Sequence, residues 1–248
     1  MCAGAEHVQL DASKLVDLAK SVAAQSSDHK LKIASRPEEG DGEGVGWGSE
    51  IHFVGDEEAT IQYLFVVDAL NFCFWPSQGE WEYEDLSTAL KSTLEADGAA
   101  LSSERLAAMD EQSLALLLGG KQLPNMAARV EHLREVGREL TERWGGSAAE
   151  LVRSCNGSAQ RFVDVIVSTF PGFRDHIMYK GRQICFYKRA QILAGDIWGA
   201  LKGRGLGAMW DVDKLTMFAG KTCCKKSLAL CNWRLPCRVP TATGARLC

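Results

Sequence analysis

One long apolar stretch, from Ala59 to Trp75, constrains the fold more than any other feature of this sequence. A helix formed there has almost no polar face to turn toward water, so it must be buried on most of its sides. Its most apolar part, Ile61 to Trp75, is too short to span a bilayer and contains Asp68. The stretch therefore predicts a buried core helix and not a membrane span.

The rest of the chain up to residue 220 is dominated by helical patterns. Apolar residues recur at helical spacing, Ser and Asp precede several of these segments as N-caps, and Gly pairs end them. Between residues 178 and 187 the period changes to that of a small hairpin turning at Lys180-Gly181. We predict a mainly α-helical globule with one small β-hairpin. The expected helices follow Asp11, Ser147 and Ser158 and span 85–96, 102–118, 126–144 and 188–201.

Composition changes abruptly near residue 220. Residues 221–248 contain six Lys or Arg, no acid and five of the nine cysteines, and they show no amphipathic period. The whole chain has a formal charge of −4, so the residues before this tail carry −10. We therefore expect one domain over residues 1–220 and a divergent, basic, Cys-rich, disordered tail over 221–248.

The bulk properties restrict the compartment and the partners. An acidic chain with a pI near 5.8 is not built to coat nucleic acid, so we expect no direct binding of tRNA or DNA. The N-terminus lacks a basic region followed by an apolar run, which argues against a signal peptide. The cysteines outside the tail are scattered, as is typical of free thiols in a reducing compartment. These features predict a cytoplasmic protein that does not associate with membranes.

The apolar stretch contains the first candidate site. Asp68 and Asn71 lie three residues apart and so share one side of the predicted helix. Burying a carboxylate and an amide is costly unless they are hydrogen-bonded. Two interpretations stay open at this point: a structural polar pair that ties the helix to a neighbour, or the wall of a ligand pocket.

The second candidate is Lys188, which falls where the hairpin enters a helix. A cation at a helix N-terminus opposes the helix dipole, so this placement favours a functional role over a stabilising one. The other charged residues nearby are better explained as surface pairs or as hydrogen bonds that tie loops. They are Arg174, Asp175, Arg182 and Arg189.

The third candidate is the segment from Trp210 to Ala219. Asp211 and Asp213 can each act as the N-cap of a helix that starts there, and this is the default interpretation for at least one of them.

Four segments in this order resemble the queuosine salvage proteins, which are queuosine 5′-phosphate N-glycosylase/hydrolases. The segments are VVDALNFCFWP, FPGFRD, YKGRQICFYKRAQIL and DVDKLTMFA, and the resemblance covers roughly residues 11–219. It implies an architecture similar to that of helical DNA glycosylases. It also implies cleavage of the N-glycosidic bond of queuosine 5′-phosphate, which releases queuine for tRNA modification, with no cofactor and no metal.

The resemblance also assigns roles to individual residues. The family's catalytic lysine, in its YKRAQ motif, corresponds to Lys188, and its catalytic aspartate corresponds to position 220, which is Gly220 here. Base recognition is implied for His52 and Asp211, with Met209 lying against the base. Asp68 and Asn71 complete the expected substrate-binding set. The sequence leaves open whether His52 is instead a surface residue.

Gly220 matters because the reaction passes through an oxocarbenium-like sugar that a carboxylate stabilises. Losing such a group at a cost of ~10³-fold in rate corresponds to about 4 kcal/mol of barrier. The family chain continues with a DYR-x-PQ segment and further helices, so the divergence at residue 220 indicates a truncated or mis-spliced product. Whether Asp196 or Asp213 replaces the missing carboxylate stays open.

Three further functions compete with an active hydrolase. An inactive nucleotide-binding remnant of the family is the first alternative, because of Gly220. A metal site in the tail is disfavoured, because the spacing of Cys223, Cys224, Cys231 and Cys237 does not match paired zinc knuckles. A DNA-repair glycosylase is disfavoured because no basic stripe lies outside the tail.

Overall fold

The computed structural model describes residues 49–74 and 81–216, together with six helical positions near the N-terminus. Those six positions agree with the helix expected after Asp11. The predictions for Trp75, for residues 217–220 and for the tail 221–248 lie outside the described residues, as does most of the loop expected at 37–50. The six positions are Ser13, Val16, Asp17, Lys20, Ser21 and Ala24.

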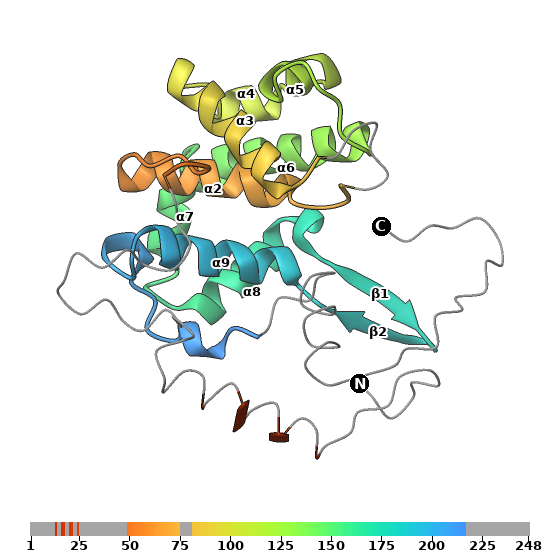
Figure 1. The fold of residues 1–248 in the computed structure, drawn as a ribbon, viewed down its shortest axis with the longest axis vertical. Helices are drawn as coiled ribbons and strands as arrows, with labels where there is room; N and C mark the ends of the chain where they lie inside the picture. The colour runs from red at the N-terminus through yellow and green to blue at the C-terminus, as the bar shows by residue number, and fades with distance from the viewer. Residues whose placement is uncertain are drawn as a thin grey trace.

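The described part is mainly helical with one small hairpin, as the sequence predicts (Figure 1). Strands β1 and β2 pair antiparallel, with His176 opposite Cys185 and Tyr179 opposite Arg182. The elements are α2 (Glu57–Leu70), α3 (Tyr83–Ala96), α4 (Ser103–Ala107), α5 (Glu111–Leu117), α6 (Met126–Trp144), α7 (Ala148–Ser154), α8 (Ala159–Thr169), η2 (Pro171–Phe173), β1 (His176–Tyr179), β2 (Arg182–Cys185), α9 (Lys188–Ala200), η3 (Gly205–Gly207) and η4 (Val212–Lys214).

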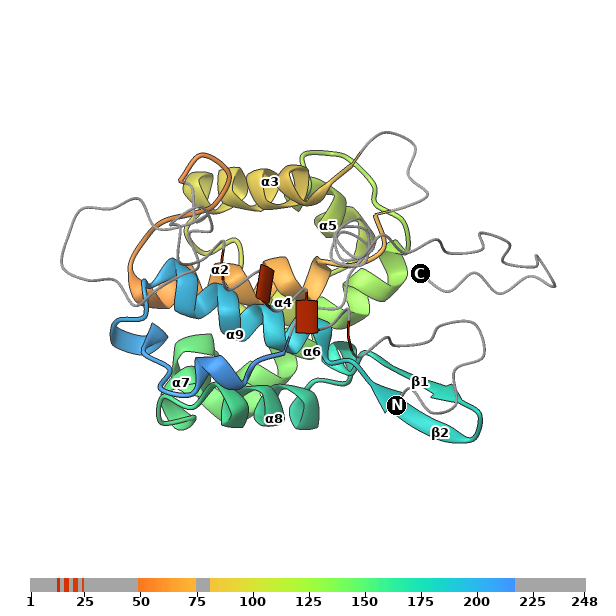
Figure 2. The same ribbon diagram turned by 60° about the horizontal axis from the view of Figure 1, so that its bottom comes forward.

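Helix α2 is the core of the molecule, which confirms the predicted burial of this stretch. The predicted helix is too long at its C-terminal end, because α2 ends at Leu70 with Asn71 as its C-cap, and residues 72–74 are not helical. Every residue from Ile61 to Leu70 is buried except Gln62. The Gln62 side chain is satisfied by the backbone of two other segments, since its Nε2 donates to the Leu101 carbonyl and its Oε1 accepts from the N–H of Ala148, the first residue of α7. Figures 1 and 2 show α9 running alongside α2, with α8 beyond it and α3 on the other side.

Local end signals explain most helix boundaries. The hydroxyl groups of Ser147 and Ser158 accept hydrogen bonds from the N–H groups three residues later, so both are the N-caps that the sequence predicts. Gly145 ends α6 in the left-handed conformation, at φ 59°. The hairpin turns at Lys180 and Gly181, both with positive φ, as expected for a two-residue turn.

The single helix expected over 102–118 is wrong. The structure has two short helices there, α4 and α5, because the Asp110 carboxylate accepts a hydrogen bond from the Ser113 N–H and starts a new helix. Helix α4 packs very closely against α6 at Gly137. A Cβ atom on Gly137 would overlap the backbone of Ser103 and Ala107, so only glycine allows this approach.

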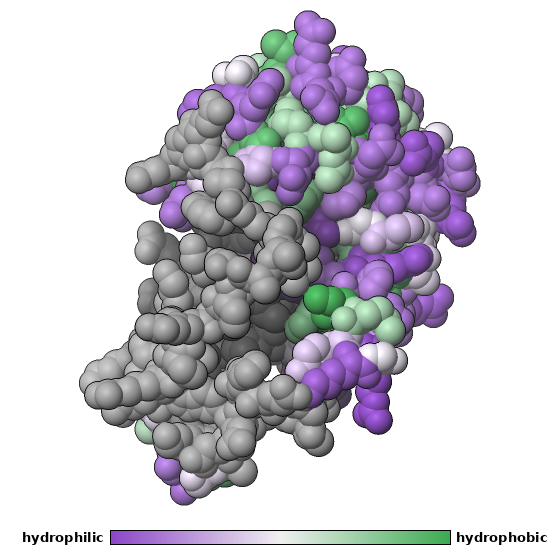
Figure 3. Space-filling view, turned by 90° about the vertical axis from the view of Figure 1, so that its right-hand side faces the viewer, coloured by the Kyte–Doolittle hydropathy of each residue, from purple (hydrophilic) through white to green (hydrophobic). Residues whose placement is uncertain are grey.

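Among the described residues, the large apolar side chains that are exposed are few. On the face drawn in Figure 3, the described residues are mainly hydrophilic and the hydrophobic ones form separate small patches. The β1–β2 hairpin projects from the helices (Figure 2) and exposes Met178 and Tyr179. Among the described residues, no helix is both long and apolar enough to cross a membrane.

Candidate functional site

The C-terminal turn of α2 is held in place by Arg129 of α6. Its guanidinium is buried and donates to the carbonyl groups of Leu70, Phe72 (2.5 Å) and Cys73 (2.9 Å). Carbonyls at the end of a helix have no partner within the helix, so Arg129 acts as a C-cap from a distant segment. Burial lowers the pKa of Arg129 to about 10, which still leaves it charged at neutral pH.

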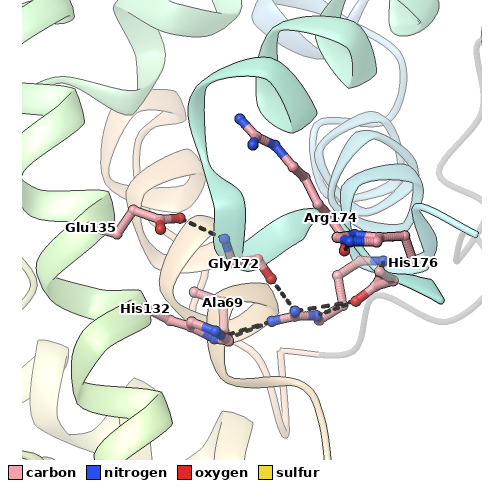
Figure 4. Close-up of polar contacts among 8 residues, drawn as sticks. Ala69, His132, Glu135, Gly172, Arg174 and His176 are labelled. Carbon is pink, nitrogen blue, oxygen red and sulfur yellow. Dashed lines mark hydrogen bonds and ion pairs between the residues drawn. The ribbon is translucent and has the colours of Figure 1, made fainter. Parts of the chain in front are cut away.

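Arg189, the second residue of α9, fixes the other side of the same turn. It donates to the Ala69 carbonyl (3.1 Å) from Nη1 and to the Gly172 carbonyl from Nη2, and it lies beside His132. In Figure 4 the labelled Ala69, His132 and Gly172 converge on this guanidinium, and Glu135 accepts from the Gly172 N–H. The expectation of a loop tie is correct, but the expectation of a surface pair is wrong, because Arg189 is buried.

Asp175 caps the N-terminus of α9 across the hairpin. Its carboxylate accepts from the Arg189 N–H (3.0 Å) and Nε (3.2 Å), while its carbonyl accepts from the Phe186 N–H (2.8 Å). A carboxylate at a helix N-terminus is electrostatically favourable. It offsets the unfavourable placement of Lys188, which begins α9 directly after Tyr187 in a left-handed conformation (φ 49°).

Lys188 is half-buried, and its charge acts on two carboxyl groups. Its positive charge lowers the pKa of Asp68 on α2 and of Asp196 on α9. Helices α2 and α9 pack side by side (Figure 2), and the charge of the predicted catalytic lysine acts on the predicted Asp68.

Lys188, Asp68 and Asp196 form a cluster of titratable groups at the junction of α2 and α9. Asp68 is the most buried of the three. Asn71 donates to its Oδ1 (3.3 Å), whereas no partner for Oδ2 exists among the described residues. Burial, followed by the negative charge of Asp196, raises the pKa of Asp68 well above its usual range; Asn71 and Lys188 oppose the shift. The expected contact between Asp68 and Asn71 is therefore present, but Asn71 alone does not satisfy the carboxyl group.

Asp196 is partly exposed, and burial raises its pKa to about 7 while Lys188 lowers it. Sequence reasoning raised Asp196 only as an open alternative, since a single acid in an amphipathic helix has no distinguishing pattern. The other open alternative, Asp213, is exposed and pairs with the adjacent Lys214 (3.1 Å). Only Asp196 therefore belongs to the cluster at the α2–α9 junction.

Aromatic and imidazole groups lie on the α3 side of α2. His52 is buried. Its Nδ1 atom lies 3.5 Å from the Tyr63 hydroxyl oxygen, and the centroid of its ring lies 5.7 Å from that of the Tyr83 ring. Burial lowers the pKa of His52, which favours the neutral ring. Burial and then the charges of Asp68 and Asp196 raise the pKa of Tyr83, so this side chain borders the same cluster. The alternative of a surface histidine is wrong.

Asp211 and Met209 occupy a different place. Asp211 accepts from the Ser158 hydroxyl (2.8 Å) and from the N–H groups of Ala159 (2.5 Å) and Gln160, at the N-terminus of α8. Burial raises its pKa, but these hydrogen bonds outweigh burial and lower it overall. Met209 is buried in the core. The Asp211 carboxylate makes no capping hydrogen bond to the turn that follows it and caps α8 instead. The N-cap prediction, made for at least one of Asp211 and Asp213, stays a prediction for Asp213, because residues after 216 lie outside the described part.

The structure thus separates the six predicted site residues into two groups. Lys188, Asp68, Asn71 and His52 are built around α2, whereas Met209 and Asp211 lie near the N-terminus of α8. The turn that contacts Arg189 follows the opposite end of α8. Base reading by Asp211 remains a prediction, and the contacts of its carboxylate in this structure are structural.

Cysteines and acids in the described part of the chain do not suggest a metal centre. No group of three or more His, Cys, Asp or Glu side chains within it is placed to hold an ion. Cys73, Cys155 and Cys185 form no disulfide. The four tail cysteines weighed as zinc ligands lie outside the described residues.

Comparison with known proteins identifies the family. The profile of the queuosine salvage protein family matches residues 51–229. This range contains the α2–α9 junction and all six predicted site residues. The chain belongs to the queuosine salvage protein family.

Individual relatives carry the same name. A queuosine 5′-phosphate N-glycosylase/hydrolase from Dictyostelium discoideum is 46% identical over 162 residues, which are 65% of this chain and 50% of the relative. Enzymes of that name from Sphaerobacter thermophilus and Bos taurus are 36% and 32% identical, over 57% and 56% of their own lengths. The chain therefore spans about half the length of the curated relatives that it matches.

Proposed function

We propose that this chain is a hydrolase that cleaves the N-glycosidic bond of queuosine 5′-phosphate and releases queuine. The relatives' names supply the substrate and the reaction. The observation that carries the proposal for this chain is the cluster at the α2–α9 junction. There the Lys188 charge acts on two carboxyl groups, Asp68 and Asp196, whose pKa values burial raises. Perturbed titratable groups of this kind gather at sites of catalysis.

The chemistry suits such a cluster. Cleavage builds positive charge on the sugar and negative charge on the leaving base. A carboxylate stabilises the first charge, and the Lys188 ammonium stabilises the second or binds the substrate's phosphate. A partly desolvated site strengthens both interactions, because the effective dielectric constant is lower than in water.

The same proposal assigns substrate contacts to the remaining predicted residues. Asn71 and His52 border the cluster, and a neutral His52 can both donate and accept a hydrogen bond at the edge of a base. Met209 and Asp211 lie near the N-terminus of α8, and a base contact by Asp211 would have to replace hydrogen bonds that its carboxylate already accepts there.

We further propose that the protein works in the cytoplasm on a free nucleotide and supplies queuine for tRNA modification. The acidic charge of the chain supports a small-molecule substrate over direct binding of tRNA or DNA.

The test is chromatographic detection of queuine after incubation of the purified chain with queuosine 5′-phosphate. The proposal predicts release of queuine and ribose 5-phosphate in equal amounts. Binding of the nucleotide without release would instead identify the inactive remnant expected from Gly220. Neither binding nor release, from a folded chain, would refute the proposal.

A further inference from the structure

Helix α9 presents two charged groups at the junction with α2, one near each end. Lys188 is its first residue and Asp196 lies eight residues later, which corresponds to roughly 12 Å along the helix axis. Both side chains are partly buried. Among the described residues no ion pair joins these two side chains, although the Lys188 charge lowers the pKa of Asp196.

Asp196 differs from the structural carboxylates of this chain. Asp175 binds Arg189, and Asp211 accepts three hydrogen bonds at the start of α8. For Asp196 the structure gives no hydrogen bond and no ion pair with any described residue, although the group is partly withdrawn from water. Packing and helix capping therefore do not explain an acid at this position.

The charges around Asp196 come from three helices. Lys188 of α9 favours its ionised form, whereas Asp68 of α2 repels it, and Tyr63 and Tyr83 both respond to its charge. In the described part of the chain, no charged side chain of α8 or of the turns η2, η3 and η4 acts on Asp196. Burial raises its pKa to about 7, so the group can both accept and release a proton near neutral pH.

We propose that Asp196 is a catalytic residue of this site and acts as the general base on the attacking water. The inference rests on the proposed function. As the water oxygen bonds to the anomeric carbon, the water proton passes to the Asp196 carboxylate. The C–N bond breaks and its electron pair goes to the base nitrogen. The protonated Asp196 then returns the proton to that nitrogen, so nucleotide and water give free base and ribose 5-phosphate.

Asp196→Asn tests the assignment, with Asp213→Asn as the matched control, since Asp213 is exposed and pairs only with its neighbour among the described residues. We expect kcat for queuine release to fall about 100-fold or more in D196N, with KM changed less than about threefold. D213N should retain the kcat of the unaltered chain. The unaltered chain should also lose activity as the pH falls below about 7 and Asp196 becomes protonated.

Thermal unfolding separates catalysis from a structural role. Because Asp196 is partly buried without a described partner, D196N should keep or raise the melting temperature of the chain. A D196N chain that melts well below the unaltered chain, or that retains kcat and its pH dependence, overturns the inference while leaving the proposed function intact.

If the unaltered chain releases no queuine, the proposed function fails separately. The role of Asp196 is then tested by measuring the affinity of the chain for queuosine 5′-phosphate by calorimetry between pH 6 and 8. We expect affinity to change over this range in the unaltered chain and in D213N but to stay constant in D196N. Equal pH dependence in D196N, or no binding by the unaltered chain, overturns the inference.

Discussion

Arg189 donates two hydrogen bonds to Asp175, from its backbone N–H at 3.0 Å and from Nε at 3.2 Å, across the base of the β-hairpin. The same guanidinium reaches the Ala69 carbonyl of α2. One side chain therefore fixes the start of α9, and with it Lys188, relative to the end of α2 that carries Asp68.

Arg189→Lys should destabilise the chain by about 3–5 kcal/mol, because a single ammonium group cannot donate at once to Asp175 and to the carbonyl groups of Ala69 and Gly172. Urea unfolding measures the loss. Arg182→Lys, at an exposed position of β2, is the control and should change stability by less than about 0.5 kcal/mol. Equal effects of the two substitutions would contradict the role assigned to Arg189.

Gly137→Ala should destabilise the chain by about 1–3 kcal/mol, because the added methyl group overlaps the α4 backbone. Gly199→Ala adds the same group inside α9, where nothing lies within 4 Å, and should stabilise the chain by about 0.5–1 kcal/mol. Chemical denaturation of the two variants measures both changes. The account of the α4–α6 contact fails if both substitutions shift stability in the same direction.

Asp211→Asn should cost about 1–2 kcal/mol at neutral pH by weakening the cap of α8. Because the pKa of Asp211 is lowered in the folded state, its stabilisation is present above the unfolded pKa of about 3.9 and is lost as the pH falls through the lower folded value. The stability difference between variant and unaltered chain should therefore shrink below about pH 4. A difference that is constant from pH 3 to 7 would argue against the cap.

For Asp68 the dependence of stability on pH should be opposite to that described for Asp211, and Asp68→Asn tests it. The pKa of Asp68 is raised in the folded state, so its ionisation opposes folding, and stability falls as the pH rises above the unfolded pKa. The variant should remove part of this decline, and the rest should come from Asp196. Stability curves from pH 4 to 8 for both chains test this, and curves that run parallel would contradict it.

The sequence predicts those parts of the fold that depend on neighbours along the chain. Ser147 and Ser158 bind N–H groups three residues away, and the apolar run of α2 is long enough to require burial. The break at Asp110 was not predicted, because the apolar spacing continues across it and only the capping geometry distinguishes two helices from one.

The sequence did not predict several hydrogen bonds that join segments far apart in the chain. Arg129 reaches carbonyls more than 55 residues earlier, and Arg189 reaches Ala69. Asp211 caps a helix that begins more than 50 residues before it. No local pattern identifies such partners. Asp68 was found because a carboxylate inside an apolar run is conspicuous, and Asp196 was not singled out because its helix is amphipathic.

The most direct test of the central claim is a single-turnover assay of queuine release with Lys188→Met, compared with Lys121→Met. Lys121 is exposed and lies over the Trp81 ring, so its loss removes an equal charge elsewhere. We predict that the unaltered chain and K121M release queuine at similar rates, while K188M is slower by about 100-fold or more. Release by K188M at the rate of K121M would contradict the claim that the junction of α2 and α9 is the active site.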